Sequence, residues 1–111
     1  MSYNVKTLDV FERQAKRLLK KYPSLANELP SLILSLKENP EQGQSIGNHC
    51  FKIRLAIASK GKGKSGGARV ITYVVVAAKN VYLISIYDKS EKASLSGKEL
   101  RALLKSIPLM G

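Results

Sequence analysis

The chain has 111 residues, and its 19 Lys and Arg against 8 Asp and Glu give a formal net charge of +11. That length suits a single domain over residues 1–111, and the charge favours an anionic partner: nucleic acid, an acidic membrane surface or an acidic protein. No segment is long and apolar enough to span a bilayer and the N-terminus lacks a signal-peptide core, so we expect a cytoplasmic protein that spans no membrane.

The first elements expected are a short strand at residues 3–7 and a helix that Thr7 or Asp9 caps and that runs to about Lys21. Apolar residues recur at helical spacing and predict a buried stripe of Phe11, Ala15, Leu18 and Tyr22. Five cations lie off this stripe: Arg13, Lys16, Arg17, Lys20 and Lys21. A solvated helix face explains them better than an RNA-binding face, which stays the alternative.

A second helix is expected directly after the first, because Pro23 ends the first helix and Ser24 can cap the next. Pro40 ends this second helix. Pro30 lies inside it, so we expect a kink or a break there. The short connection predicts two antiparallel helices joined by a tight turn.

The apolar period changes to two after a turn-rich loop at residues 41–47. Residues 51–58 alternate apolar and mostly cationic or small side chains, which is typical of a half-buried strand. A glycine-rich tract at 59–67 separates it from two more expected strands, 68–77 and 81–87. Three consecutive strands with short links predict an antiparallel meander.

Ser96 and Glu99 have the spacing of a capping box, so we expect a final short helix that Pro108 ends. The fold class is therefore α+β: two N-terminal helices on a small antiparallel sheet, with an N-terminal edge strand and a short C-terminal helix.

Between Gln42 and Tyr87 there is no Asp or Glu, although seven cations fall in this span: Lys52, Arg54, Lys60, Lys62, Lys64, Arg69 and Lys79. Lys52 and Arg54 are two residues apart and share one strand face, and Arg69 begins the neighbouring strand. Solvated faces usually mix both signs, and like charges across strands destabilise. The sequence therefore predicts a bound anion near these three cations.

The glycine-rich tract ends in Gly63-Lys64-Ser65, but Ala58 stands where a P-loop needs glycine, so a nucleotide-binding loop is rejected. Lys60, Lys62 and Lys64 are candidates for RNA phosphate contacts, with a solvated hairpin loop as the alternative.

Cofactor chemistry has little support in the sequence. Cys50 is the only cysteine and His49 the only histidine, which argues against a disulfide, a Cys/His metal site or a histidine pair. We expect no metal and no cofactor.

Several segments in order resemble the RelE/HigB-type toxins of bacterial type II toxin–antitoxin systems: residues 11–16 and 20–23, Asn39-Pro40-Glu41-Gln42-Gly43, Phe51-Lys52-Ile53-Arg54, residues 60–69, and Ile86-Tyr87-Asp88-Lys89-Ser90-Glu91. The glycine-lysine tract resembles the HigB-like branch. The resemblance implies a RelE-like fold, cleavage of mRNA on the ribosome, and inhibition by a cognate antitoxin.

The resemblance places the family's basic site residues on Lys52, Arg54, Arg69 and Lys89. Some members also use a tyrosine further on, but this chain has none after Tyr87, so Glu91 and Tyr87 are the candidates to replace it. Tyr87 is also a candidate for RNA binding. Three other readings stay open: a ParE-type toxin that binds DNA gyrase, a non-catalytic basic RNA-binding module, and an inactive toxin.

Overall fold

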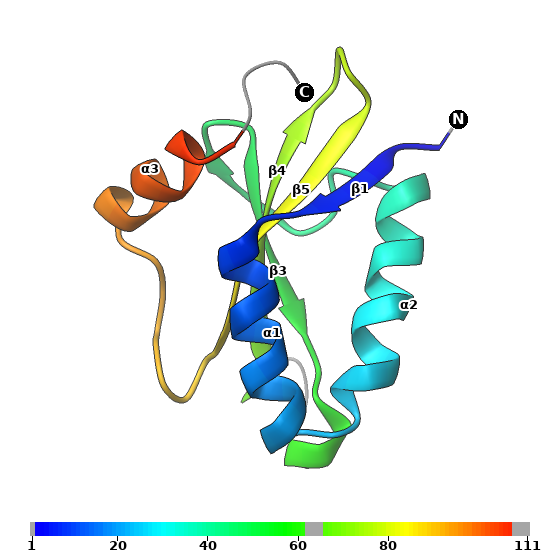
Figure 1. The fold of residues 1–111 in the computed structure, drawn as a ribbon, viewed down its shortest axis with the longest axis vertical. Coiled ribbons are helices and arrows are strands. Elements are labelled where there is room, and N and C mark those ends of the chain that lie inside the picture. Colours follow the sequence, from blue (N-terminus) through cyan, green and yellow to red (C-terminus); the bar gives the residue numbers. More distant parts are fainter. Residues whose placement is uncertain (1, 62–65, 108–111) are drawn as a thin grey trace.

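A five-stranded mixed sheet forms the centre of the protein in the computed structural model, which describes residues 2–61 and 66–107. The elements are β1 (Asn4–Thr7), α1 (Asp9–Lys21), α2 (Leu25–Glu38), β2 (Gln44–Gly47), β3 (Cys50–Leu55), a 3₁₀ turn (Ala58–Lys60), β4 (Ala68–Val75), β5 (Asn80–Asp88) and α3 (Gly97–Lys105). The strand order is β1-β5-β4-β3-β2 (Figure 1). Only the β1–β5 pair is parallel among these strands.

The predicted α+β fold is confirmed: two N-terminal helices, the antiparallel β3-β4-β5 meander, the N-terminal strand and the short C-terminal helix are all present. The capping box of α3 is confirmed as well, because Ser96 Oγ accepts a hydrogen bond from the Glu99 backbone N–H while the Glu99 carboxylate accepts one from the Ser96 N–H.

One strand was not predicted. The expected loop at 41–47 contains β2, which folds back on β3 through Asn48 and His49. Both residues have positive φ, as the tight primed turns between hairpin strands require. Gly43, with φ of +96°, allows close approach: a Cβ there would lie 2.6 Å from the Lys52 carbonyl oxygen. The short Gln-Ser-Ile-Gly strand lacks the alternation that would have revealed it.

The helix starts also differ from the expectation. Leu8 occupies the N-cap position of α1, and the Thr7 hydroxyl bonds the Glu12 carboxylate instead of a backbone N–H. Ser24 does occupy the N-cap position of α2, but its hydroxyl bonds Glu28 and the Ser59 backbone N–H, which ties the helix turn to the 3₁₀ turn. The helix α2 runs through Pro30 without a break.

The two sheet faces are covered by different helices. One face packs against α1 and α2 through a core that includes Phe11, Leu18, Leu25, Val70 and Leu83. The other face carries Ile71, Tyr82, Ile84 and Tyr87 under Leu100 and Ile107 of the C-terminal segment. Figure 1 shows α1 in front of the sheet, α2 to its right and α3 to its left. Within the described ranges, no helix is long and apolar enough to cross a membrane.

Candidate functional site

Three site candidates form a row, the cation row, across the three central strands near one end of the sheet. Arg54 on β3 lies directly opposite Arg69 on β4, and Arg69 lies directly opposite Tyr87 on β5. Lys52 is two residues from Arg54 and so lies on the same face. This is the face that α1 and α2 leave open, since Ile53, Val70 and Ile86, which alternate with these residues, point into the core beneath the two helices.

The cation row places two like charges on neighbouring strands, and one of them is buried. Arg69 is only 3% exposed, whereas Arg54 is exposed. Burial lowers the pKa of Arg69, and the nearby positive charge of Arg54 lowers it further. Arg69 does have partners, among them the Ala68 carbonyl oxygen at 3.1 Å. Like charges directly opposite on neighbouring strands cost stability, and an anion between them would relieve that cost.

Tyr87 ends the row as a buried phenol. It is 6% exposed, and its hydroxyl makes no hydrogen bond within the described part of the chain. Burial raises the pKa of Tyr87, while Arg69, Lys92 and the nearby Leu95 backbone N–H act in the opposite direction; that N–H is close to the oxygen but not in hydrogen-bonding geometry. An unpaired buried hydroxyl typically costs about 1–3 kcal/mol.

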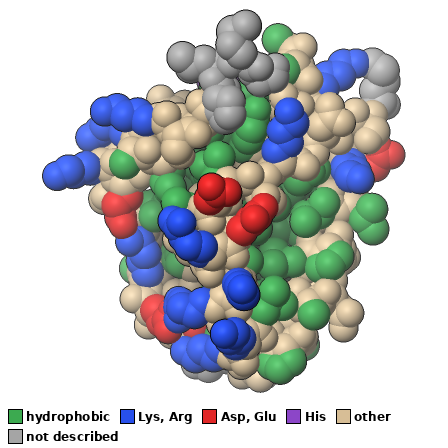
Figure 2. All heavy atoms as spheres, viewed as in Figure 1, with side chains coloured by type: hydrophobic (Ala, Val, Ile, Leu, Met, Phe, Trp, Pro, Cys, Tyr) green, Lys and Arg blue, Asp and Glu red, His purple; other side chains and the backbone are tan. Residues whose placement is uncertain are grey.

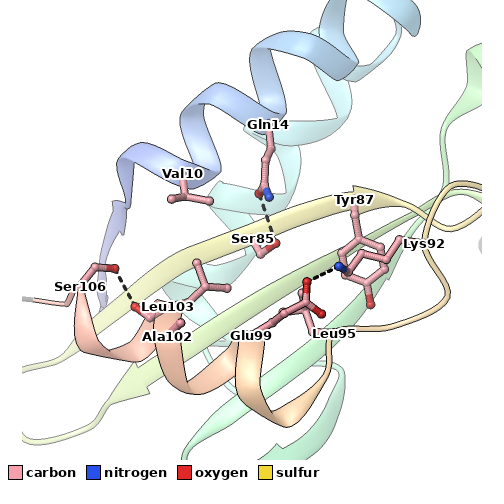
Figure 3. Close-up of a pocket in the computed structure, with 10 residues that line it drawn as sticks. All are labelled: Val10, Gln14, Ser85, Tyr87, Lys92, Leu95, Glu99, Ala102, Leu103 and Ser106. Atoms are coloured by element: carbon pink, nitrogen blue, oxygen red, sulfur yellow. Dashed lines mark hydrogen bonds and ion pairs between the residues drawn. The ribbon is translucent and has the colours of Figure 1, made fainter.

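Two cavities flank Tyr87. The larger, about 420 Å³, lies between α1, β5 and α3 and is shown in Figure 3, where Lys92 pairs with Glu99 and Gln14 with Ser85. In that view the Tyr87 hydroxyl points away from Gln14 and Ser85, past Leu95. The smaller cavity, about 190 Å³, is bordered by Tyr87 and Leu95 as well, and Lys52 lines it.

Lys60 lies away from the cation row, in a buried ion pair. Its ammonium is 2.6 Å from Asp88 Oδ1, with its side chain 8% exposed and that of Asp88 fully buried. Tyr22 donates a hydrogen bond to Asp88 Oδ2 at 2.7 Å, and Ser90 donates through both its N–H and its hydroxyl. Burial alone would raise the pKa of Asp88, but the bonds from Lys60, Tyr22 and Ser90 outweigh it and hold that pKa well below its usual value. The Lys60 side chain is therefore buried and paired with Asp88, whereas an RNA phosphate contact would need it to be exposed.

Glu91 lies beside α1 rather than beside Arg69. Its carboxylate pairs with Arg17 at 2.8 Å and with Lys21 at 3.2 Å. Figure 2 shows the blue side chains gathered over the lower part of α1, where these pairs form. Hydrogen bonds from Arg17 and Lys21 lower the pKa of Glu91. The carboxylate therefore acts here as a link between the end of β5 and α1.

The remaining sequence candidates are placed as follows. Lys89 follows β5 directly, is exposed, and donates its backbone N–H to the Gly67 carbonyl oxygen. Lys62 and Lys64 lie outside the described residues. Cys50 is fully buried, and burial raises the pKa of its thiol to about 11, which keeps it protonated at neutral pH. Over residues 2–61 and 66–107 there is no group of three His, Cys, Asp or Glu that could hold a metal ion.

Sequence reasoning missed the cluster around Asp88. Its partners come from the end of α1, the 3₁₀ turn and the segment after β5, so they lie up to 66 residues from Asp88 in the chain. Gln14 was also missed: its side-chain oxygen accepts from the Ser85 hydroxyl and the Ile86 backbone N–H. The sequence offered one signal: Asp88 is the single acidic residue at the end of a long apolar strand. A carboxylate that is buried needs a partner.

Known structures share this architecture. The chain is similar to a variant of the E. coli toxin RelE with two arginines replaced by alanine, in the free state (TM-score 0.64, 19% identity, 97% of this chain and 100% of that chain). It is also similar to the isolated E. coli RelE toxin (0.61, 18%, 96% and 100%) and to the same variant in complex with a peptide of the antitoxin RelBc (0.56, 19%, 97% and 100%). The fold is therefore that of the RelE toxin.

Family membership rests on the sequence itself. Residues 8–107 match the family described as the RelE toxin of the RelE/RelB toxin–antitoxin system. The protein belongs to this RelE toxin family.

Proposed function

We propose that this protein is an endoribonuclease toxin that cuts mRNA on the ribosome, and that the cation row with Lys52 is its catalytic site. One observation supports this most strongly: two arginines, Arg54 and Arg69, occupy directly opposite positions on a sheet face whose strands β3 and β4 carry no acidic residue. Such an arrangement is favourable when a phosphate lies against it. The HigB-like placement, which the glycine-lysine tract supports, is part of the proposal.

The chemistry is attack of an RNA 2′-oxygen on the adjacent phosphorus. The 2′-O–P bond forms and the P–O5′ bond breaks, which leaves a 2′,3′-cyclic phosphate and a 5′-hydroxyl. Arginine stays protonated and cannot be the base. Arg54 contacts the phosphate through forked hydrogen bonds, and buried Arg69 stabilises the charge that develops on the phosphate oxygens, since fixed charge acts strongly where water is excluded. Lys52 and Lys89 are our candidates for moving protons at the 2′-oxygen and the 5′-oxygen.

Two expected catalytic or binding residues have structural roles in this account. Lys60 neutralises Asp88, and Glu91 joins β5 to α1. Neither is needed for the phosphate chemistry above. Tyr87 stays in the proposal as an RNA-binding residue because it ends the row.

The proposed partners are mRNA on the ribosome and a cognate antitoxin. E. coli RelE has been solved with an antitoxin peptide, which supports an antitoxin for this chain. An acidic or amphipathic antitoxin segment would complement the net charge of +11.

The test is a reconstituted translation reaction with a defined mRNA. The parent protein should produce fragments that end in a cyclic phosphate and begin with a 5′-hydroxyl, while Arg54→Gln should lose most cleavage. Lys6→Gln, which removes an exposed charge on β1, is the matched control and should cut normally. Intact mRNA with the parent protein, together with inhibition of DNA gyrase supercoiling, would contradict the proposal in favour of a ParE-type toxin. Intact mRNA without gyrase inhibition would favour a non-catalytic RNA-binding protein or an inactive toxin.

A further inference from the structure

The smaller cavity beside Tyr87 has the size and lining of a site for a single anionic group. Its volume is about 190 Å³, which is below the ~300–1,000 Å³ of pockets that hold drug-sized ligands. Its apolar wall comes from Ile46, Ile71 and Leu100. Its polar wall comes from Lys52 on β3, Tyr87 on β5 and the segment that leads into α3, including Ser96 and Gly97.

The start of α3 borders this cavity, with Ser96 and Gly97 in its lining. The helix spans nine residues from Gly97 to Lys105, and its capping box uses the N–H groups of Ser96 and Glu99. The N–H groups of Gly97 and Lys98, in the same first turn, have no hydrogen-bond partner within residues 2–61 and 66–107. The first turn of a helix carries partial positive charge and favours an anion.

Tyr87 gives a second and independent indication of a ligand. Its hydroxyl is buried and makes no hydrogen bond within the described residues, and its side chain lines the cavity. In Figure 3 the hydroxyl points away from Gln14 and Ser85 and toward Leu95, which also lines the smaller cavity. Buried polar atoms are normally satisfied, so an orphaned one beside a cavity needs an explanation. A ligand oxygen in the cavity would accept the phenol proton in a hydrogen bond.

The charge balance around the cavity favours a negative ligand. Lys52 lines it, and Arg69 lies next to Tyr87 across the strands. Among the described residues that line the two cavities, the one carboxylate is that of Glu99, which is already bonded to the Ser96 N–H and paired with Lys92. That engaged carboxylate faces the larger cavity.

We propose that this cavity, formed by Lys52, Tyr87 and the first turn of α3, holds one phosphate group, of an RNA chain or of free phosphate. In the RNA case the proposal rests on the endoribonuclease function, and the group bound is a backbone phosphate next to the one held by Arg54. The ligand then joins α3 to the sheet, because its oxygens bond donors on both.

Gly97 offers a matched pair of variants that tests the backbone donors. Gly97→Pro removes the N–H of the first helical position, where proline is well tolerated. Ser96 already has the extended conformation that a following proline requires, with φ −75° and ψ 161°. Gly97→Ala keeps the N–H. An added Cβ would meet the exposed Arg101 side chain at 3.3 Å in both variants. Apart from the rest of the proline ring, the two variants therefore differ in that one donor.

The probe is inorganic phosphate, titrated at constant ionic strength against chloride and followed by amide NMR shifts and calorimetry. In the parent protein we expect the amide signals of Gly97 and Lys98 to shift together in a saturable way. Gly97→Pro and Tyr87→Phe should each weaken binding by about tenfold or more, the factor for a hydrogen bond to a charged group. Gly97→Ala should bind within about twofold of the parent.

Two results would overturn the proposal. No saturable shift of the α3 amides in the folded parent, or equal affinity in Gly97→Pro and Gly97→Ala, would remove the site. A 2′-deoxy oligonucleotide, which cannot be cut, then separates the two sources: competition with phosphate supports an RNA phosphate, and simultaneous binding supports free phosphate. Because no cleavage is measured, the site can be confirmed even if the endoribonuclease proposal fails, and the reverse also holds.

Discussion

The ion pair between Lys60 and Asp88 makes the sharpest prediction about stability. Asp88→Asn keeps the shape of the side chain but leaves the Lys60 ammonium, 8% exposed, without its counter-charge at 2.6 Å. Removing one member of a buried pair typically costs about 3–5 kcal/mol. The entropy of unfolding scales with length, so for 111 residues 1 kcal/mol corresponds to about 4 °C. We therefore expect the Tm to fall by about 12–20 °C.

The assay is thermal and urea unfolding of Asp88→Asn at pH 7, beside a double variant, Lys60→Met with Asp88→Asn. The double variant should recover much of the loss, because no buried charge is left unpaired. A single variant within about 1 kcal/mol of the parent, or a double variant no more stable than the single, would refute the view that this pair is buried and coupled.

The pH dependence of the same variant gives a second test. A carboxyl with a depressed pKa stabilises the fold at pH values above its unfolded pKa of about 3.9, and this stability is lost as pH falls from there toward the folded pKa. The parent protein should therefore lose unfolding free energy steadily below about pH 4. In Asp88→Asn the unfolding free energy should fall less steeply below about pH 4. A decrease as steep as in the parent protein would mean that other groups cause the loss of stability in acid.

Three further predictions concern single side chains. Tyr87→Phe should raise the unfolding free energy by about 1 kcal/mol or more in phosphate-free buffer, since it removes an orphaned buried hydroxyl; a fall in a urea melt would contradict this. Glu91→Gln should cost no more than about 1 kcal/mol, because its pairs with Arg17 and Lys21 are solvent-exposed, and should cut mRNA normally; loss of cleavage at unchanged stability would restore Glu91 as a catalytic base. Cys50 is buried and its pKa is raised to about 11, so it should react with iodoacetamide at pH 8 only when urea unfolds the chain. Fast labelling of the folded protein would show that the region around Cys50 opens to solvent.

Residues with strong local patterns were predictable from sequence. The alternation around Lys52 and Arg54 placed both on one strand face, and the short links of the meander placed Arg69 beside them. The Ser96–Glu99 spacing gave the start of α3 correctly. These features depend on neighbours within a few residues or on strands that follow one another directly.

Features that depend on distant partners were not predictable. Lys60 was expected to contact RNA phosphate or to lie in a solvated loop, because it belongs to a glycine-lysine tract. Its ammonium instead lies in the interior beside Asp88 and the Tyr22 ring, which come from other elements. Glu91 was a candidate to replace the late tyrosine as a catalytic group, but its carboxylate pairs with Arg17 and Lys21 of α1. Asn48 and His49 form a left-handed turn, a conformation that is uncommon for residues other than glycine and so is hard to assign from sequence.

The central claim is that the guanidinium groups of Arg54 and Arg69 stabilise the reacting phosphate. Single-turnover cleavage of mRNA on stalled ribosomes, with saturating parent protein or folded Arg69→Gln, measures this directly. A lost stabilising charge predicts a rate about 100- to 1000-fold lower at unchanged ribosome affinity. Cleavage by Arg69→Gln at the parent rate would contradict the claim.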